Sequence, residues 1–131
     1  MSYLWIFLGG GLGSIARFAG ANFVSRHLGD HFPWGTLLVN VTGSFVIGCF
    51  ATLTGPDGRW MVAHSGRQFV MIGICGGYTT FSAFSLQTLL LARDGEWFKA
   101  GANAALSFVL CMIAVWLGHL LAAGFNSARG L

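Results

Sequence analysis

The sequence predicts an all-α membrane protein with four transmembrane helices, and three observations carry this prediction. Of the 131 residues, 55% are hydrophobic and only 8% are charged, whereas a soluble domain carries about 25% charged residues. The mean hydropathy is +0.70. The length accommodates four apolar segments of roughly 20 residues each, with short loops between them. The net charge of +3 is small and spread along the chain, which argues against nucleic acid as a partner.

Four apolar stretches define the predicted spans within a single domain of residues 1–131. They cover about residues 4–24, 34–53, 68–91 and 100–123. Pro33 suits the start of the second span. A cluster of turn-forming residues at 55–58 follows that span, and a polar segment at 93–96 closes the third. These boundaries leave no linker and no second domain.

Basic residues are balanced between the two ends of the predicted bundle. Those on one side are Arg26, Arg93 and Lys99, those on the other are Arg59, Arg67 and Arg129, and Arg17 lies inside the first span. Orientation in a membrane follows the bias of Lys and Arg between loops, so an even distribution gives no preferred orientation. A chain that inserts both ways can form an antiparallel, dual-topology homodimer, which is the assembly we predict. The alternative is that different loop boundaries give unequal numbers of basic residues on the two sides and so a preferred orientation.

Polar side chains follow helical spacing in two of the predicted spans. The two sets are Thr36, Asn40 and Ser44 in the second span, and Asn103, Ser107 and Cys111 in the fourth. Steps of four residues place each set along one helix face. Such groups can be interhelical hydrogen-bond partners, worth about 0.6 kcal/mol per bond. Alternatively they line a path in which amide N–H and hydroxyl groups replace part of an anion's hydration shell.

The third predicted span contains an interruption near its middle, at residues 76–80. Gly76 and Gly77 each carry a helix penalty of roughly 1 kcal/mol, and the β-branched Thr79 and Thr80 follow them closely. A broken backbone at membrane depth must line a cavity or coordinate something, and freed carbonyl oxygens suit a hard cation such as sodium. The alternative is an unbroken, glycine-rich helix that packs closely against a neighbour.

Two aromatic residues follow this interruption. Phe81 and Phe84 lie three residues apart on one helix face, with Ser82 beside them. The edge of a phenyl ring is electropositive and can meet an anion, although two phenylalanines at this spacing also serve in ordinary packing. Both interpretations place the pair near the middle of the membrane.

The first predicted span carries a charge and a cluster of glycines. Arg17 is expected toward one end of the span, where its side chain either reaches the membrane surface or attracts anions at a vestibule. Gly9 and Gly13 form a small-x-x-x-small face, which predicts close packing against another helix.

Three ordered segments carry a resemblance to a known family. They are Gly9-Gly10-x-x-Gly13-x-x-x-Arg17, Gly35-Thr36-Leu37-x-Val39-Asn40-x-x-Gly43-Ser44-Phe45-x-x-Gly48 and Gly73-x-x-Gly76-Gly77-x-Thr79-Thr80-Phe81-Ser82-x-Phe84. They cover most of residues 9–84 and resemble the helix signatures of the Fluc (CrcB-type) fluoride ion channels. The fourth span matches that family mainly in its length and in its polar step of four.

The resemblance implies an assembly and a function. It implies an antiparallel dual-topology homodimer with two narrow pores, in the cell (inner) membrane, that exports fluoride passively and is not an enzyme. It also implies a central structural sodium ion bound by backbone oxygens of Gly76 and Thr79. The partners it implies are therefore fluoride, a second copy of the chain and the lipid bilayer.

The resemblance also implies roles for individual side chains. Asn40 donates a hydrogen bond to fluoride, Phe81 and Phe84 present ring edges to it, and Arg17 lies near a vestibule. Ser107 belongs to a polar track on the fourth span. Cys111 stands where a hydroxyl is expected, and a thiol is a poor donor, so the last step of the track differs in this chain.

Two other classes of membrane protein compete with this interpretation. A small multidrug-type transporter also has four short helices, but proton-coupled export of cations needs a carboxylate within the membrane. The four acidic residues are all expected in loops: Asp30, Asp57, Asp94 and Glu96. A non-conducting membrane assembly subunit is the second alternative, and it predicts that the polar side chains pair helix to helix and leave no passage.

Overall fold

The computed structural model describes residues 1–128, and all regular secondary structure in that range is helical. Its elements are α1 (Ser2–Leu28), α2 (Trp34–Leu53), α3 (His64–Arg67), the π-helix η1 (Gln68–Cys75), α4 (Gly76–Tyr78), α5 (Phe81–Arg93) and α6 (Trp97–Ser127). Four segments are long and apolar enough to cross a membrane, and the third of them combines α3, η1, α4 and α5. The prediction of four spans is confirmed.

The second span has the predicted bounds, whereas the other three are longer than predicted. The first extends over 2–28, the third over 64–93 and the fourth over 97–127. The extensions contain both polar and apolar residues, all of them helical. In α1 the helix ends only at Gly29, which has φ of 86° and donates its N–H to the Ser25 carbonyl at 2.8 Å, a conformation that favours glycine.

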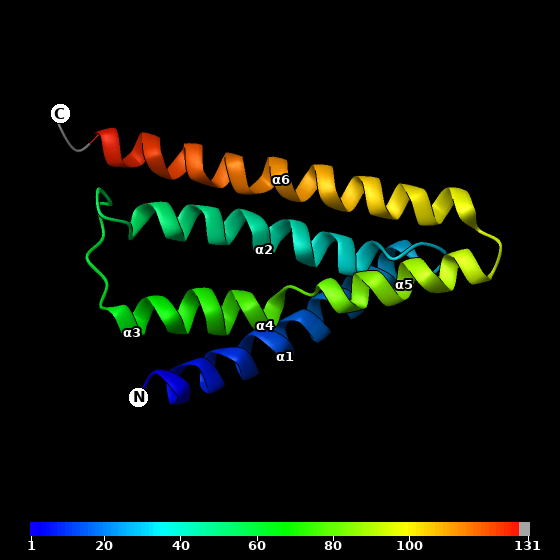
Figure 1. Ribbon diagram of the computed structural model, residues 1–131, viewed down its shortest axis with the longest axis horizontal. Coiled ribbons are helices and arrows are strands. Elements are labelled where there is room, and N and C mark those ends of the chain that lie inside the picture. The colour runs from blue at the N-terminus through cyan, green and yellow to red at the C-terminus, as the bar shows by residue number, and fades with distance from the viewer. Residues whose placement is uncertain (129–131) are drawn as a thin grey trace.

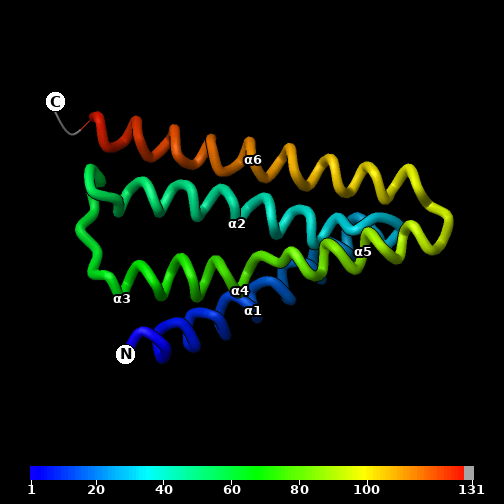
Figure 2. The backbone as a smooth tube through the Cα atoms, in the orientation of Figure 1, coloured from blue at the N-terminus to red at the C-terminus, as the bar shows by residue number. Residues whose placement is uncertain are grey.

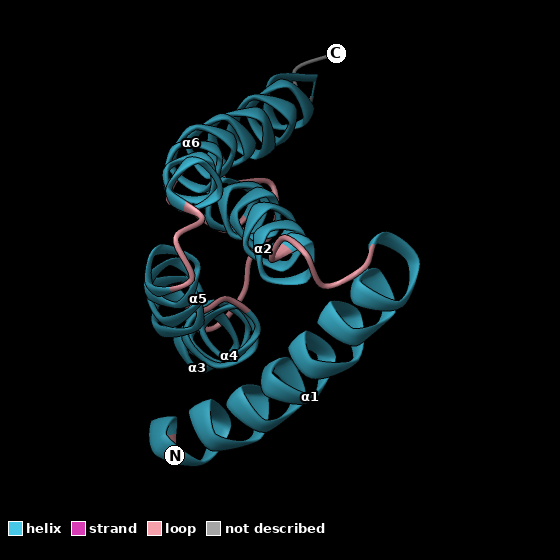
Figure 3. Cartoon of the chain, turned by 90° about the vertical axis from the view of Figure 1, so that its right-hand side faces the viewer, coloured by secondary structure: helices cyan, strands magenta, loops and turns pink. Residues whose placement is uncertain are grey.

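The spans run side by side and alternate in direction (Figures 1 and 2). The α1–α2 and α5–α6 connections lie at one end of the bundle, and the N-terminus, the α2–α3 connection and the end of α6 lie at the other. α2 packs along α6, while α1 crosses obliquely and contacts α2, η1 and α4 (Figure 3). The basic residues of the two ends are therefore grouped as predicted, except that Arg129 lies outside the described residues.

Glycines let the first and third spans approach each other. Gly9 and Gly13 are buried in the contact with η1, and a Cβ atom at Gly9 would lie 2.5 Å from the Phe69 carbonyl oxygen. A Cβ at Gly77 would lie 2.5 Å from the Gly10 carbonyl oxygen. The predicted packing face on the first span is confirmed. Helices in lipid associate through such close contacts because the hydrophobic effect contributes little there.

The interruption of the third span does not fall on the two glycines. Gly76 is helical, with φ and ψ of −64° and −37°, and both glycines belong to α4. The backbone becomes extended at Thr79 (−88°, 157°) and Thr80 (−152°, 116°), and α5 begins at Phe81. The interruption therefore lies within the predicted segment 76–80, at its last two residues and not at its glycines. Gly77 stays helical because its missing side chain allows α1 to pack against it.

The segment before the interruption has a second departure from regular helix. The eight residues of η1 form a π-helix, whose hydrogen bonds skip one residue more than those of an α-helix. π-helical segments are rare and occur frequently near functional sites. The sequence analysis did not predict this segment.

Candidate functional site

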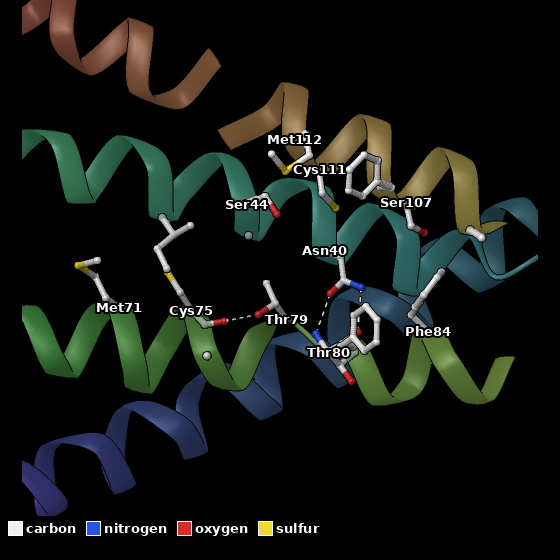
Figure 4. A pocket seen from close by; sticks show the side chains of 16 residues that line it. Asn40, Ser44, Met71, Cys75, Thr79, Thr80, Phe84, Ser107, Cys111 and Met112 are labelled. Atoms are coloured by element: carbon white, nitrogen blue, oxygen red, sulfur yellow. Dashed lines mark hydrogen bonds between the residues drawn. The ribbon is translucent and has the colours of Figure 1, made fainter. Parts of the chain in front are cut away.

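A groove of about 540 Å³ lies between α2, the third span and α6. Its side chains come from all three spans, and Figure 4 shows them projecting into a common space. The predicted site residues that line it are Asn40, Ser44, Gly76, Thr79, Phe81, Phe84 and Ser107. Cys75, Thr80 and Cys111 line it as well, and the residues that line it include no charged side chain. The groove is a neutral, partly polar surface.

The extended backbone at the interruption is paired with a side chain of α2. Asn40 donates from Nδ2 to the Thr80 carbonyl oxygen at 2.9 Å, and the Thr80 N–H donates to Asn40 Oδ1 at 2.7 Å (Figure 4). The Thr80 hydroxyl caps α5 by accepting from the Ala83 N–H at 3.1 Å, which is a favourable helix start. Thr80 is only 9% exposed, so its polar groups need these partners.

Two carbonyl groups lose their helical donors as a result. In a continuous α-helix the Thr80 N–H would donate to the Gly76 carbonyl, and the Ala83 N–H would donate to the Thr79 carbonyl. Both N–H groups donate elsewhere, to Asn40 and to the Thr80 hydroxyl. The Gly76 and Thr79 carbonyl oxygens are therefore released at the groove. Neutral oxygens of this kind are the ligands that a hard cation such as sodium prefers, so these residues fit the predicted ion.

Phe81 and Phe84 lie together at the start of α5. Their ring centroids are 5.3 Å apart and the ring planes are inclined by 53°. Phe81 is 79% exposed, so the groove is open on its side in the single chain. The N-terminal end of α5 lies at the same point, and a helix N-terminus carries a partial positive charge.

Asn103 lies away from this groove. Its side chain is 2% exposed and donates from Nδ2 to Thr88 Oγ1 on α5 at 2.9 Å. The Thr88 hydroxyl in turn donates to the Phe84 carbonyl at 2.8 Å. Ser107 lies within 3.5 Å of Asn103 Oδ1 and also lines the groove. The polar stripe on the fourth span is therefore divided between interhelical pairing and the groove.

Three further predicted residues lie outside the groove. Thr36 lines a second pocket of about 360 Å³ that also contains Gln87. Ser82 is exposed, and its hydroxyl is 3.3 Å from that of Thr80. Arg17 is half-buried on α1. It lies nearer the middle of that helix than predicted, because α1 continues for about three turns beyond it.

Two residues that organise the site, Thr88 and Thr80, were not predicted as site residues from the sequence. Thr88 follows Phe81 and Phe84 on the same face of α5, because positions 81, 84 and 88 repeat at helical spacing. That pattern could have identified it. Thr80 was predicted to lie in the interruption but was given no role in the site, and its pairing with Asn40 joins residues 40 positions apart, which no local pattern indicates.

The four carboxylates lie outside the long helices, as predicted. Asp30, Asp57, Asp94 and Glu96 all occupy connections between spans. A transporter that couples cation export to protons needs such a group within the membrane. Their positions argue against the multidrug-transporter alternative.

Four apolar spans, three of which border an uncharged groove, define a multi-pass membrane protein in which neutral polar groups and aromatic rings meet between helices. The chain belongs to the family described as CrcB-like protein, Camphor Resistance (CrcB), whose profile matches residues 4–119. This confirms the resemblance drawn from the three motifs.

Relatives support the same assignment over nearly the whole chain. The chain is 62% identical to the fluoride-specific ion channel FluC of Opitutus terrae, over 98% of this chain and 97% of that protein. It is 58% identical to the protein of the same name from Methylocella silvestris, over 99% of both chains. These relatives are named as ion channels and not as enzymes, in agreement with the prediction.

Proposed function

We propose that this chain is a fluoride-selective, passive ion channel. The observation that carries the proposal is the groove, in which Asn40, Ser44 and Ser107 place neutral polar groups beside Phe81 and Phe84. The relatives named fluoride-specific ion channel FluC support the choice of ion. Fluoride is small and strongly hydrated, so a selective path must replace its lost water molecules with hydrogen-bond donors.

The groove contains several kinds of donor suited to an anion. Asn40 has two N–H groups, of which one is used by the Thr80 carbonyl, so one remains. Hydroxyl protons of Ser44 and Ser107 can rotate toward an anion. Ring edges of Phe81 and Phe84 add a positive electrostatic potential. Conduction follows the fluoride gradient, and its physiological direction is export across the cell inner membrane.

The functional unit in this proposal is an antiparallel homodimer with two pores. The groove is open beside Phe81 in one chain, and a second copy can supply the missing wall. Basic residues are balanced between the two ends of the bundle, which favours insertion in both orientations. Arg17 on α1 is assigned to a vestibule in this arrangement.

A structural sodium ion completes the proposed channel. The Gly76 and Thr79 carbonyls, released from helical hydrogen bonds, would hold it together with their counterparts in the second copy. Such an ion supplies positive charge that neutralises the exposed carbonyl dipoles and fixes the two subunits at the interrupted third spans.

Liposome efflux tests the proposed function. Vesicles that contain the purified protein are loaded with fluoride or with chloride, and release is followed with ion-selective electrodes. We expect rapid loss of fluoride and retention of chloride. Equal release of both ions contradicts the proposed selectivity, and retention of both favours the non-conducting assembly subunit.

A further inference from the structure

The contact between Asn40 and Thr80 has the geometry of a paired peptide unit. One amide side chain accepts from the N–H and donates to the carbonyl of the same backbone residue, at 2.7 and 2.9 Å. Neighbouring strands of a sheet satisfy each other in this way, but here a helix side chain replaces the missing strand. Figure 4 shows the Asn40 amide facing the Thr80 backbone across the space between α2 and the third span.

The pair is needed because Thr80 is extended between two helices. Its N–H and carbonyl lie outside the regular hydrogen bonding of both α4 and α5, and the residue is buried. In a membrane a backbone polar group without a partner costs several kcal/mol. Among short side chains, asparagine offers both a donor and an acceptor on one planar group. Serine has a single hydroxyl, and an ionised aspartate has acceptors only.

The pair also keeps the Thr80 N–H from making the hydrogen bond of a continuous helix. Its acceptor in a continuous helix would be the Gly76 carbonyl, four residues earlier. By holding this N–H at 2.7 Å, Asn40 Oδ1 prevents the helix from continuing through the interruption. Without Asn40, the nearest way to satisfy the Thr80 N–H is to restore that helical bond, which would withdraw the Gly76 carbonyl from the groove.

We infer that Asn40 is a positioning residue: its amide keeps Thr80 extended and thereby keeps the Gly76 and Thr79 carbonyls free to bind a cation. This inference rests on the proposed sodium site and deepens it. Asn40 thus has two tasks. One N–H and the side-chain oxygen hold Thr80 extended, and the second N–H remains available for an anion in the groove that Asn40 lines. A single side chain couples the cation site to the anion path.

The sodium dependence of fluoride efflux tests this coupling. The Asn40→Leu variant keeps the branched shape of the side chain but loses both hydrogen bonds. We expect the sodium concentration that gives half-maximal fluoride efflux to rise about tenfold or more, since two hydrogen bonds no longer oppose the helical conformation. If this variant yields no folded protein, Asn40→Ala is measured in its place.

A matched control on the same helix is Thr52→Val. It removes the hydroxyl that lies 2.8 Å from His119 Nδ1 on α6, far from the interruption, and we expect the sodium dependence of the wild type. A lower maximal efflux in Asn40→Leu with unchanged half-saturating sodium would show that Asn40 serves the anion alone, and would overturn the inference.

Thermal unfolding in detergent provides a readout that does not depend on transport. An ion that binds the folded protein raises its unfolding temperature, so we expect sodium, compared with potassium at the same concentration, to stabilise the wild type. In Asn40→Leu the same stabilisation should need a sodium concentration about tenfold or more higher. An equal response of the unfolding temperature to sodium in the wild type and Asn40→Leu contradicts the inference. A wild type that does not select fluoride contradicts the proposed function, while the sodium dependence of unfolding still decides on the inference.

Discussion

Asn40 and Asn103 look alike in the sequence and differ in the structure. Each belongs to a polar stripe with steps of four residues, and each donates from Nδ2 to an oxygen at 2.9 Å. Asn40 pairs with the backbone of an extended residue at the edge of the groove. Asn103 pairs with the side chain of Thr88 and is 2% exposed. The first asparagine shapes a site, and the second ties α5 to α6.

The difference teaches what helical spacing can and cannot reveal. Spacing identifies the face that carries polar groups, because residues four apart lie above one another. It does not identify the partner, which depends on where the neighbouring span leaves the helical conformation. Asn40 faces the extended residue Thr80, whereas Asn103 faces the regular helix α5, where backbone groups are already paired and only side chains remain to bind.

The same substitution at the two positions tests this contrast most strongly. For Asn40→Asp we expect fluoride efflux per folded protein to fall at least about 100-fold, because a fixed negative charge beside an anion path raises the energy of the ion by several kcal/mol. The Thr80 N–H keeps its acceptor but the Thr80 carbonyl loses its donor, so some stability is lost as well and the deciding quantity is efflux per folded protein. Efflux is measured with a fluoride electrode and normalised to folded protein. Unchanged efflux would remove Asn40 from the pathway.

For Asn103→Asp we expect a loss of stability without a comparable loss of efflux per folded protein. The new carboxyl group is buried and can no longer donate to Thr88 unless it is protonated. We expect the free energy of unfolding to fall by about 1–3 kcal/mol, the usual cost of leaving a buried polar group without its partner. Thermal unfolding in detergent measures this change. If Asn103→Asp unfolds like the wild type but no longer conducts fluoride, Asn103 belongs to the anion path and the contrast fails.

The sequence predicted the number of spans and most of the groove because both depend on local patterns. Apolar length sets the spans, and the second was predicted with the bounds that the structure has. Asn40, Ser44, Phe81, Phe84 and Ser107 were all placed on the faces that line the groove. These assignments need only helical periodicity and hydropathy.

The conformation of the third span could not be predicted in the same way. The glycines and threonines of the segment 76–80 indicated an interruption there, but Gly76 and Gly77 remain helical, and Gly77 packs closely against Gly10. The extended residues are Thr79 and Thr80, and Thr80 is held by a side chain 40 residues away in the sequence. Contacts between distant segments decide such a conformation, so a single sequence does not contain a local signal for it.

Ser107 contacts Asn103 and also lines the groove together with Asn40. Of the three substitutions, that of Ser107 should have the smallest effect. Its hydroxyl lines the groove and lies 3.5 Å from Asn103 Oδ1, at the limit of a hydrogen bond. Ser107→Ala should therefore lower fluoride efflux about 2- to 5-fold, as expected for the loss of one neutral donor worth about 1 kcal/mol. The thermal unfolding of this variant should match that of the wild type. A clear loss of stability with unchanged efflux would show that Ser107, like Asn103, serves the contact between α5 and α6. Asn40 and Ser44 would then be the polar groups of the anion path.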